Sequence, residues 1–176
     1  MNGTPASVPL QDTLVQLKAH LAHALPTLFS RMGGVTLGTG GSLASPQMEW
    51  DTVYTLAEGH FPLVLTMHLS ASLAWRASCH MLRSEYVGRE DIEECEAELL
   101  NVLAGQTLST LYQHLDGPVR LHAPTVVAGK ENPAPVAGGG DVLFFHGCGE
   151  DRLEVHFLIP DDGLPPALLP SFGGTG

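Results

Sequence analysis

Three polar residues in one helical stretch of this chain have the types and the spacing to act on a single target. Glu94, Glu98 and Asn101 are separated by three and by two residues, so an α-helix would place them on one face. A carboxylate can hold a cationic group, and a carboxamide can donate and accept hydrogen bonds at once, which suits the orientation of a water molecule. Such acid–amide pairs also occur on ordinary solvated helices, and the spacing alone does not choose between a functional face and a plain surface.

The helix that carries these residues is predicted to run over 89–114. On a helical wheel of about 100° per residue, Glu94, Glu98, Asn101 and Gly105 fall within an arc of about 60°. The opposite side is an apolar stripe of the kind that packs against a core, made of Ile92, Leu99, Leu100, Leu103, Leu108 and Leu111. A glycine inside an exposed helix costs about 1 kcal/mol relative to alanine, but it lets another backbone come close. Gly105 therefore indicates that a macromolecule docks on the polar face.

A proline farther along the chain extends this pattern, since twenty-two residues separate Asn101 from Pro124. With this spacing the sequence resembles the chemotaxis phosphatases of the CheC/CheX/FliY family, and CheX in particular. Their signature is Asp or Ser, three residues, Glu, two residues, Asn, about twenty-two residues and Pro. The segment 98–105 is similar to the family's Glu-Leu-x-Asn-x-x-Ala-Gly, and 124–129 is similar to the Pro-Thr-Val-Val-Ser-Gly of CheX. One departure is Glu94, an acid that stands where the family has Asp or Ser.

The resemblance implies a function and a role for each matching residue. The substrate would be the phospho-aspartate of a response-regulator receiver domain such as phosphorylated CheY. Asn101 would orient the attacking water, Glu98 would pair with a lysine of the receiver, and Glu94, Gly105 and Pro124 would contribute to docking. The receiver would bring its own Mg²⁺, so this chain needs no cofactor and no metal site. The alternative is a non-catalytic adaptor that keeps the docking face and binds a receiver domain or a flagellar-switch-like partner.

Composition supports a single globular domain over 1–160, followed by a mobile Pro/Gly-rich tail over 161–176. Nineteen acids against eight bases give a net charge of −11, which argues against nucleic acid and anionic membranes as partners. No stretch approaches the roughly 18 apolar residues of a membrane helix, and the N-terminus lacks the pattern of a signal peptide. Three cysteines without CxxC spacing predict neither a disulfide framework nor a structural zinc site. We expect a cytoplasmic protein.

The order of elements predicts an α/β (α+β) domain, with a mostly antiparallel sheet and long helices packed on it. Periodicity and composition favour helices over 9–31, 70–84 and 89–114, and strands over 48–57, 61–69, 119–122, 141–147 and 152–160. Pro26 should interrupt the first helix near Ala22, because proline lacks the N–H that a helix interior uses. Glu93 and Glu96 break the apolar stripe of the long helix, which predicts that its N-terminal end extends beyond the core.

The closing hairpin and the histidines lead to two further expectations. Strands 141–147 and 152–160 are apolar on both faces, and such strands are usually covered on both sides or continued by a neighbour. Together with the resemblance to CheX, this predicts a two-fold homodimer that buries sheet surface and leaves both Asn101 faces open. Among nine histidines, His20 and His23 lack a third metal ligand, and His146 and His156 are expected to pack across the hairpin.

Overall fold

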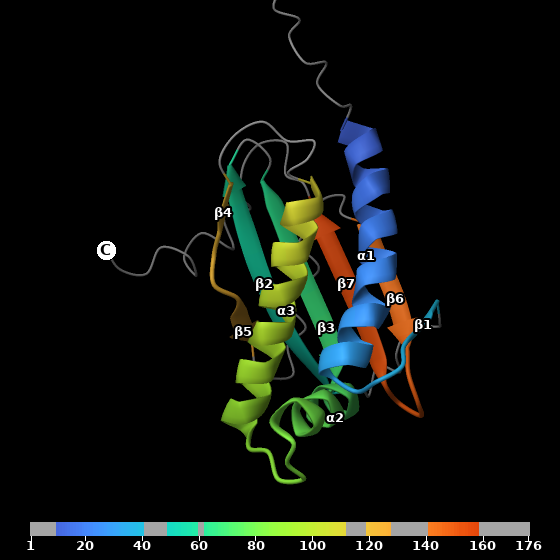
Figure 1. Cartoon of the computed structure of the whole chain (residues 1–176), viewed down its shortest axis with the longest axis vertical. Helices are drawn as coiled ribbons and strands as arrows, with labels where there is room; N and C mark the ends of the chain where they lie inside the picture. The colour runs from blue at the N-terminus through green and yellow to red at the C-terminus, as the bar shows by residue number, and fades with distance from the viewer. Residues whose placement is uncertain (1–9, 41–48, 60–61, 112–118, 128–140, 159–176) are drawn as a thin grey trace, which may run out of the picture.

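The computed structural model describes residues 10–40, 49–59, 62–111, 119–127 and 141–158, and it consists of one sheet with helices on one face (Figure 1). In chain order, the elements are α1 (Leu10–Met32), β1 (Gly38–Thr39), β2 (Trp50–Gly59), β3 (Leu63–Ser70), α2 (Ala71–Leu82), α3 (Arg89–Leu111), β4 (Val119–Leu121), β5 (Thr125–Val127), β6 (Asp141–His146) and β7 (Arg152–Leu158). The predicted fold class is confirmed. The predicted tail over 161–176 lies outside the described residues.

Every strand pairing in the described part of the sheet is antiparallel, and the strand order is β1-β6-β7-β3-β2-β4, with β5 also paired to β2. The hairpin of β2 and β3 forms the centre, in register from Trp50 opposite Ser70 to Ala57 opposite Leu63. Strand β3 is buried at every position. Its residues alternate between two faces of the sheet: Leu63, Leu65, Met67 and Leu69 belong to the apolar face, and Val64, Thr66, His68 and Ser70 belong to the other face, which is buried as well.

The core lies between the sheet and the helices. Helices α1 and α3 lie across one face of the sheet, and α2 closes one end of this layer (Figure 1). The largest fully buried side chains come from α1, α2, β2, β3, β6 and β7, and include Leu17, Leu21, Leu25, Phe29, Leu56, Leu65, Met67, Leu73, Phe145 and Phe157. Burial of about 25 cal/mol per Å² of apolar surface is the main force that holds these elements together.

Helix α1 continues through Pro26, so the predicted interruption near Ala22 is wrong. Proline removes one backbone hydrogen bond from the helix interior. Leu21, Leu25 and Phe29 surround this position on the buried face and are 0% exposed. Their contacts with the core offset the lost hydrogen bond, so tertiary packing holds a helix that the local sequence disfavours.

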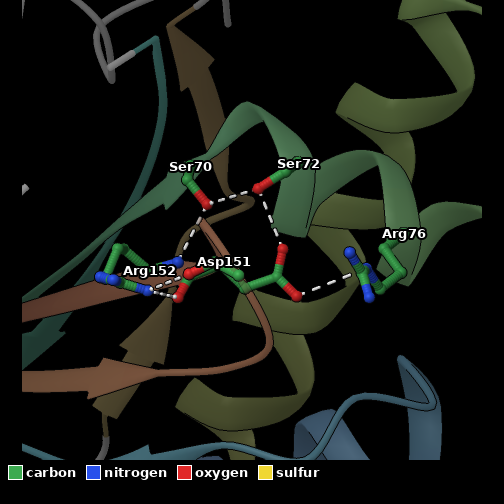
Figure 2. Close-up of polar contacts among 6 residues, drawn as sticks. Ser70, Ser72, Arg76, Asp151 and Arg152 are labelled. Carbon is green, nitrogen blue, oxygen red and sulfur yellow. Dashed lines mark hydrogen bonds and ion pairs between the residues drawn. The ribbon is translucent and has the colours of Figure 1, made fainter. Parts of the chain in front are cut away.

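The turn between β6 and β7 is fastened to the start of α2 by a buried acid (Figure 2). Asp151 is 0% exposed, its Oδ1 accepts a 2.9 Å hydrogen bond from Ser72 Oγ, and Arg76 Nε lies 3.3 Å from its Oδ2. The backbone N–H of Arg152 donates to Ser70 Oγ over 3.0 Å. These contacts fix the closing hairpin against α2 and therefore against the helix layer.

Candidate functional site

Helix α3 is the element that carries the predicted site, and its sequence explains its position. The Asp91 carboxylate accepts a 2.8 Å hydrogen bond from the backbone N–H of Gly88, as a capping box does, and Glu90 and Asp91 lie where the helix dipole favours acids. The underside of the helix is buried through Leu99, Leu100, Leu103, Ala104, Leu108 and Leu111. This stripe sets the rotation of the helix, so the opposite side must face away from the core.

The structure brings four of the five predicted site residues together on that outer side of α3. Glu94, Glu98 and Asn101 are exposed, and Gly105 is half-buried. Within the described part of the chain, no hydrogen bond or ion pair engages the side chains of Glu94, Glu98 or Asn101. A Cβ added at Gly105 would meet nothing within 4 Å. The face is therefore open, with free carboxylates, a free carboxamide and a bare stretch of helix backbone.

Pro124, the fifth residue, approaches the helix from the sheet. It is half-buried and directly precedes β5, which pairs with β2 and packs against α3 (Figure 1). Val126 of β5 packs against the core. Pro124 is thus held beside the helix by a strand that the sequence did not predict, and it is not part of the polar face of α3 itself.

The buried side of the same helix contains an acid, Glu96, whose position differs from the one expected from the sequence. Glu96 is 1% exposed, so the expectation that it lies on an end of α3 beyond the core is wrong. Arg89 of α3 forms two contacts of 2.8 Å with the carboxylate of Asp51 on β2 and a third of 2.8 Å, from Nε, with Glu93. Asp51, Arg89, Glu93 and Glu96 are called the α3 clamp below. The one sequence signal for it was the interruption of the apolar stripe.

Burial and charge shift the pKa of two groups on this part of α3. Burial, followed by the negative charge of Asp51, raises the pKa of Glu96 to about 8, and the positive charge of Arg89 opposes this shift. Burial also raises the pKa of the Cys95 thiol. Glu96 is therefore a neutral acid at pH 7, whereas a thiol with a raised pKa is a poor nucleophile.

The polar face of α3 is an open surface rather than a pocket. A hollow of about 520 Å³ lies between the end of α1 and α2, lined by residues that include Gly34, Arg76, His80 and Arg83, and α3 contributes nothing to its lining. Small molecules usually bind in concave sites. An exposed helix face suits a macromolecular partner instead, which agrees with the interpretation of Gly105.

The contacts of His146 and His156 on the closing hairpin differ from those expected from the sequence. The register places His146 opposite Arg152 and His156 opposite Val142, so the predicted contact between His146 and His156 is wrong. His156 lies edge-on against His68 of β3, with ring centroids 5.0 Å apart. No group of three His, Cys, Asp or Glu residues in the described ranges is arranged to hold a metal ion.

The chain has the fold of the CheC/CheX/FliY proteins. It is similar to the chemotaxis protein CheX of Desulfovibrio desulfuricans, with 15% identity and a TM-score of 0.65 over 82% of this chain and 99% of that one. It is similar to CheX in the CheX–CheY–BeF3–Mg²⁺ complex from Borrelia burgdorferi, with 17% identity and a TM-score of 0.61 over 86% and 97%. It is also similar to Thermotoga maritima FliY, with 14% identity and a TM-score of 0.56 over 92% and 93%.

At these identities the similarity establishes the fold, while the residues of the site rest on the sequence pattern. No family model matches the sequence, and no curated protein matches it either. Among the described helices, none is long and apolar enough to span a membrane.

Proposed function

We propose that this protein is a phosphatase that hydrolyses the phospho-aspartate of a CheY-type response-regulator receiver domain. The observation that carries the proposal is the outer face of α3, where Glu98 and Asn101 are exposed and free of hydrogen bonds to the rest of the described chain. Their spacing matches the CheC/CheX/FliY signature, and the chain has the fold of these proteins. One of the solved structures with this fold is a CheX in complex with CheY.

The chemistry asks little of the phosphatase beyond the placement of a water. An acyl phosphate is already activated, so a water in line with the leaving carboxylate can attack phosphorus. The new P–O bond forms to the water, the bond to the aspartate oxygen breaks, and the products are inorganic phosphate and a free aspartate. The Asn101 carboxamide can accept a hydrogen bond from this water and donate one to a phosphoryl oxygen. Mg²⁺ belongs to the receiver in this proposal and supplies charge neutralisation there.

Glu98 serves recognition in this proposal, and Glu94, Gly105 and Pro124 complete the docking surface. A lysine of the receiver that pairs with Glu98 would hold the two proteins in register while Asn101 reaches the phosphoryl group. Such an ion pair contributes most when the interface excludes water. Glu94 continues the negative face by one turn, and Gly105 leaves room for the backbone of the partner.

The alternative function is a non-catalytic adaptor that binds the receiver without hydrolysing it. The observation in its favour is Glu94, which differs from the Asp or Ser of the signature. The two functions differ in one measurable quantity. An adaptor leaves the rate of receiver dephosphorylation unchanged at saturating concentration, whereas a phosphatase increases it.

The decisive experiment measures the decay of phosphorylated CheY-type receivers with and without this protein, alongside two amide variants. We expect acceleration by the wild type and a loss of about 100-fold for Asn101→Ala, which is the usual scale for a residue that positions a reacting group. Receiver binding by Asn101→Ala should stay within a few-fold of the wild type, because the carboxamide orients water and does not anchor the partner.

Gln106→Ala is the matched control, since Gln106 is an exposed amide on the same helix but outside the polar face. We expect it to keep full activity. Equal activity of Asn101→Ala and Gln106→Ala would remove Asn101 from the mechanism. Tight binding without any acceleration by the wild type would establish the adaptor.

A further inference from the structure

Glu96 is a buried acid on the side of α3 opposite the proposed site, and its carboxyl group lies beside that of Asp51. Both of its carboxyl oxygens are buried and have no hydrogen-bond partner among the described residues. It is two residues from Glu98 on the same helix, and it points to the side that packs on the sheet. A buried polar group without a hydrogen bond is costly. A glutamate at this position is therefore not explained by packing alone.

The neighbours of Glu96 connect the first turns of α3 to the centre of the sheet. Arg89 Nη1 and Nη2 each lie 2.8 Å from an oxygen of Asp51, a bidentate arrangement of the strong type. Asp51 is 5% exposed and belongs to β2. Arg89 also binds Glu93, one helical turn along α3. One guanidinium thus fastens the start of the helix to a buried strand position.

When Glu96 holds a proton, the buried carboxylate of Asp51 is the one fully buried charge of the α3 clamp, and Arg89 is its partner. Arg89 carries one positive charge between the carboxylates of Asp51 and the partly exposed Glu93, so a second buried carboxylate would have no cation of its own. The groups that face Glu96 are Asp51 from β2 and Arg89, Glu93 and Cys95 from α3, with Ser78 of α2 beside Cys95. Ionised Glu96 would repel Asp51, and a charge in this position also loses its hydration.

We propose that Asp51, Arg89 and Glu96 are positioning residues, which seat the first turns of α3 on the sheet and thereby place Glu94 and Glu98 for docking. An uncharged Glu96 suits this arrangement, because it adds no second buried charge beside Asp51. The functional part of this inference rests on the proposed receiver phosphatase. The structural part does not, because the seating of α3 is a property of the free protein. Release of the clamp would shift the N-terminal half of α3, which contains both acids of the docking face.

The pH dependence has a definite sign. The pKa of Glu96 is raised from 4.5 to about 8 in the folded chain, so folding takes up a proton between these values. The seating of α3 is therefore strongest below about pH 4.5, weakens as the pH rises toward 8, and changes no further above that. In the folded protein itself, the ionised form of Glu96 accumulates around pH 8, and receiver affinity should fall there.

Hydrogen exchange of the α3 amides, corrected for intrinsic rates, tests the structural part. In the wild type we expect protection over residues 92–98 to decrease at least about tenfold from pH 5 to pH 8. Glu96→Gln keeps the shape and the neutral state of the protonated acid, so its protection should be flat over this range. Glu150→Gln is the control, since it removes one exposed carboxylate at the β6–β7 turn and should follow the wild type.

Receiver binding tests the functional part with the same proteins. Glu96→Gln should bind within about twofold of the wild type at pH 7 and should lack the loss of affinity that the wild type shows between pH 7 and 9. Arg89→Met should weaken binding at pH 7, and Asp51→Asn combined with Arg89→Met should restore part of it, because the pair is then removed without an unpaired buried charge.

Equal pH profiles of protection in wild type and Glu96→Gln would overturn the inference, whether or not a receiver is bound. A flat profile in Glu96→Gln without any receiver binding would instead support the clamp and contradict the proposed function. If Arg89→Met does not fold, the comparison of Glu96→Gln with Glu150→Gln still decides.

Discussion

At the level of single residues, the proposed site separates two tasks between two neighbours on α3. Asn101 offers a neutral donor and acceptor to a water molecule, and Glu98 offers a charge to the partner. Both side chains are exposed, and neither forms a hydrogen bond or an ion pair with another of the described residues. A site of this kind is complete only when a second protein covers it, because neither residue is desolvated beforehand.

Glu98 should therefore affect affinity more than Asn101 does. We expect Glu98→Ala to weaken binding of the phosphorylated receiver about tenfold, which corresponds to about 1.4 kcal/mol. Glu98→Lys should weaken it further, because it turns attraction to a receiver lysine into repulsion. Titration calorimetry at two salt concentrations measures both effects. Glu150→Lys makes the same charge change on an exposed turn and serves as control. If both Glu98 variants bind like the wild type, Glu98 is a solvated surface residue.

At the level of elements, α3 has a glycine where helix stability alone would favour another residue. Gly105→Ala should raise the free energy of unfolding by about 0.5–1 kcal/mol, because alanine is the better helix former and its Cβ meets nothing within 4 Å. Gly105→Trp should instead block the receiver and weaken binding at least about tenfold while the protein stays folded. Thermal unfolding and a binding assay separate these effects. Normal binding by Gly105→Trp would mean that no partner approaches this turn.

Strand β3 contains a second titratable group whose burial has a measurable consequence. His68 is 4% exposed, its Nδ1 lies 2.8 Å from Thr52 Oγ1, and its ring meets that of His156. Burial first and then His156 lower the pKa of His68 to about 4, against a smaller opposing effect of Glu154. An unfolded histidine titrates near 6.5, so the unfolded chain binds the proton more readily between these values.

We therefore expect His68 to destabilise the fold as the pH falls from about 6.5 to 4, by up to about 3 kcal/mol. Urea unfolding of the wild type and of His68→Leu at several pH values in this range measures the difference. The carboxyl groups that titrate in this range are the same in both proteins, so their contributions cancel in the difference between the two unfolding free energies. His68→Leu should be less stable at pH 7, where it leaves Thr52 without its partner, and should lose less stability on acidification. Parallel curves for the two proteins would contradict the neutral, buried histidine.

At the level of the whole molecule, the edge of the sheet at β6 favours self-association. Among the described residues, β1 pairs with β6 at Phe145 and His146, and the backbone N–H of Gly40 donates to the carbonyl of Phe144. Val142, Leu143 and Phe144 are half-buried. An edge strand with apolar side chains is a site where a second chain can add. We propose that two copies pair through this sheet surface with a two-fold axis, which leaves both α3 faces open.

Light scattering should then give about 37 kDa at micromolar concentration, twice the 18.7 kDa of one chain. Phe144→Glu should shift the protein toward the monomer, because it buries a charge in the pair. Receiver binding should survive this change, since the proposed interface and the α3 face lie on different elements. A wild type that remains at about 18.7 kDa would exclude the dimer and leave the phosphatase proposal unaffected.

The periodicity of α3 was sufficient to predict which residues share its outer face. Helical spacing is a local property, so the positions of Glu94, Glu98 and Asn101 follow from the order of residues in one segment. The long helices and strands could be predicted for the same reason, because their type depends on patterns within single segments. The central hairpin, for example, follows from the β-branched and apolar composition of two adjacent segments.

Only the tertiary structure decided the features that depend on distant segments. Glu96 is buried because its side of α3 packs on β2, where Asp51 and its partner Arg89 lie beside it. No pattern within the sequence of α3 reveals that Asp51 is its neighbour. Strand β5 exists through its pairing with β2, and α1 passes Pro26 because core contacts outweigh one missing hydrogen bond. Local spacing can therefore specify which residues share one face of a helix. The burial and the pKa of those residues depend on the distant segments that the fold packs against the helix.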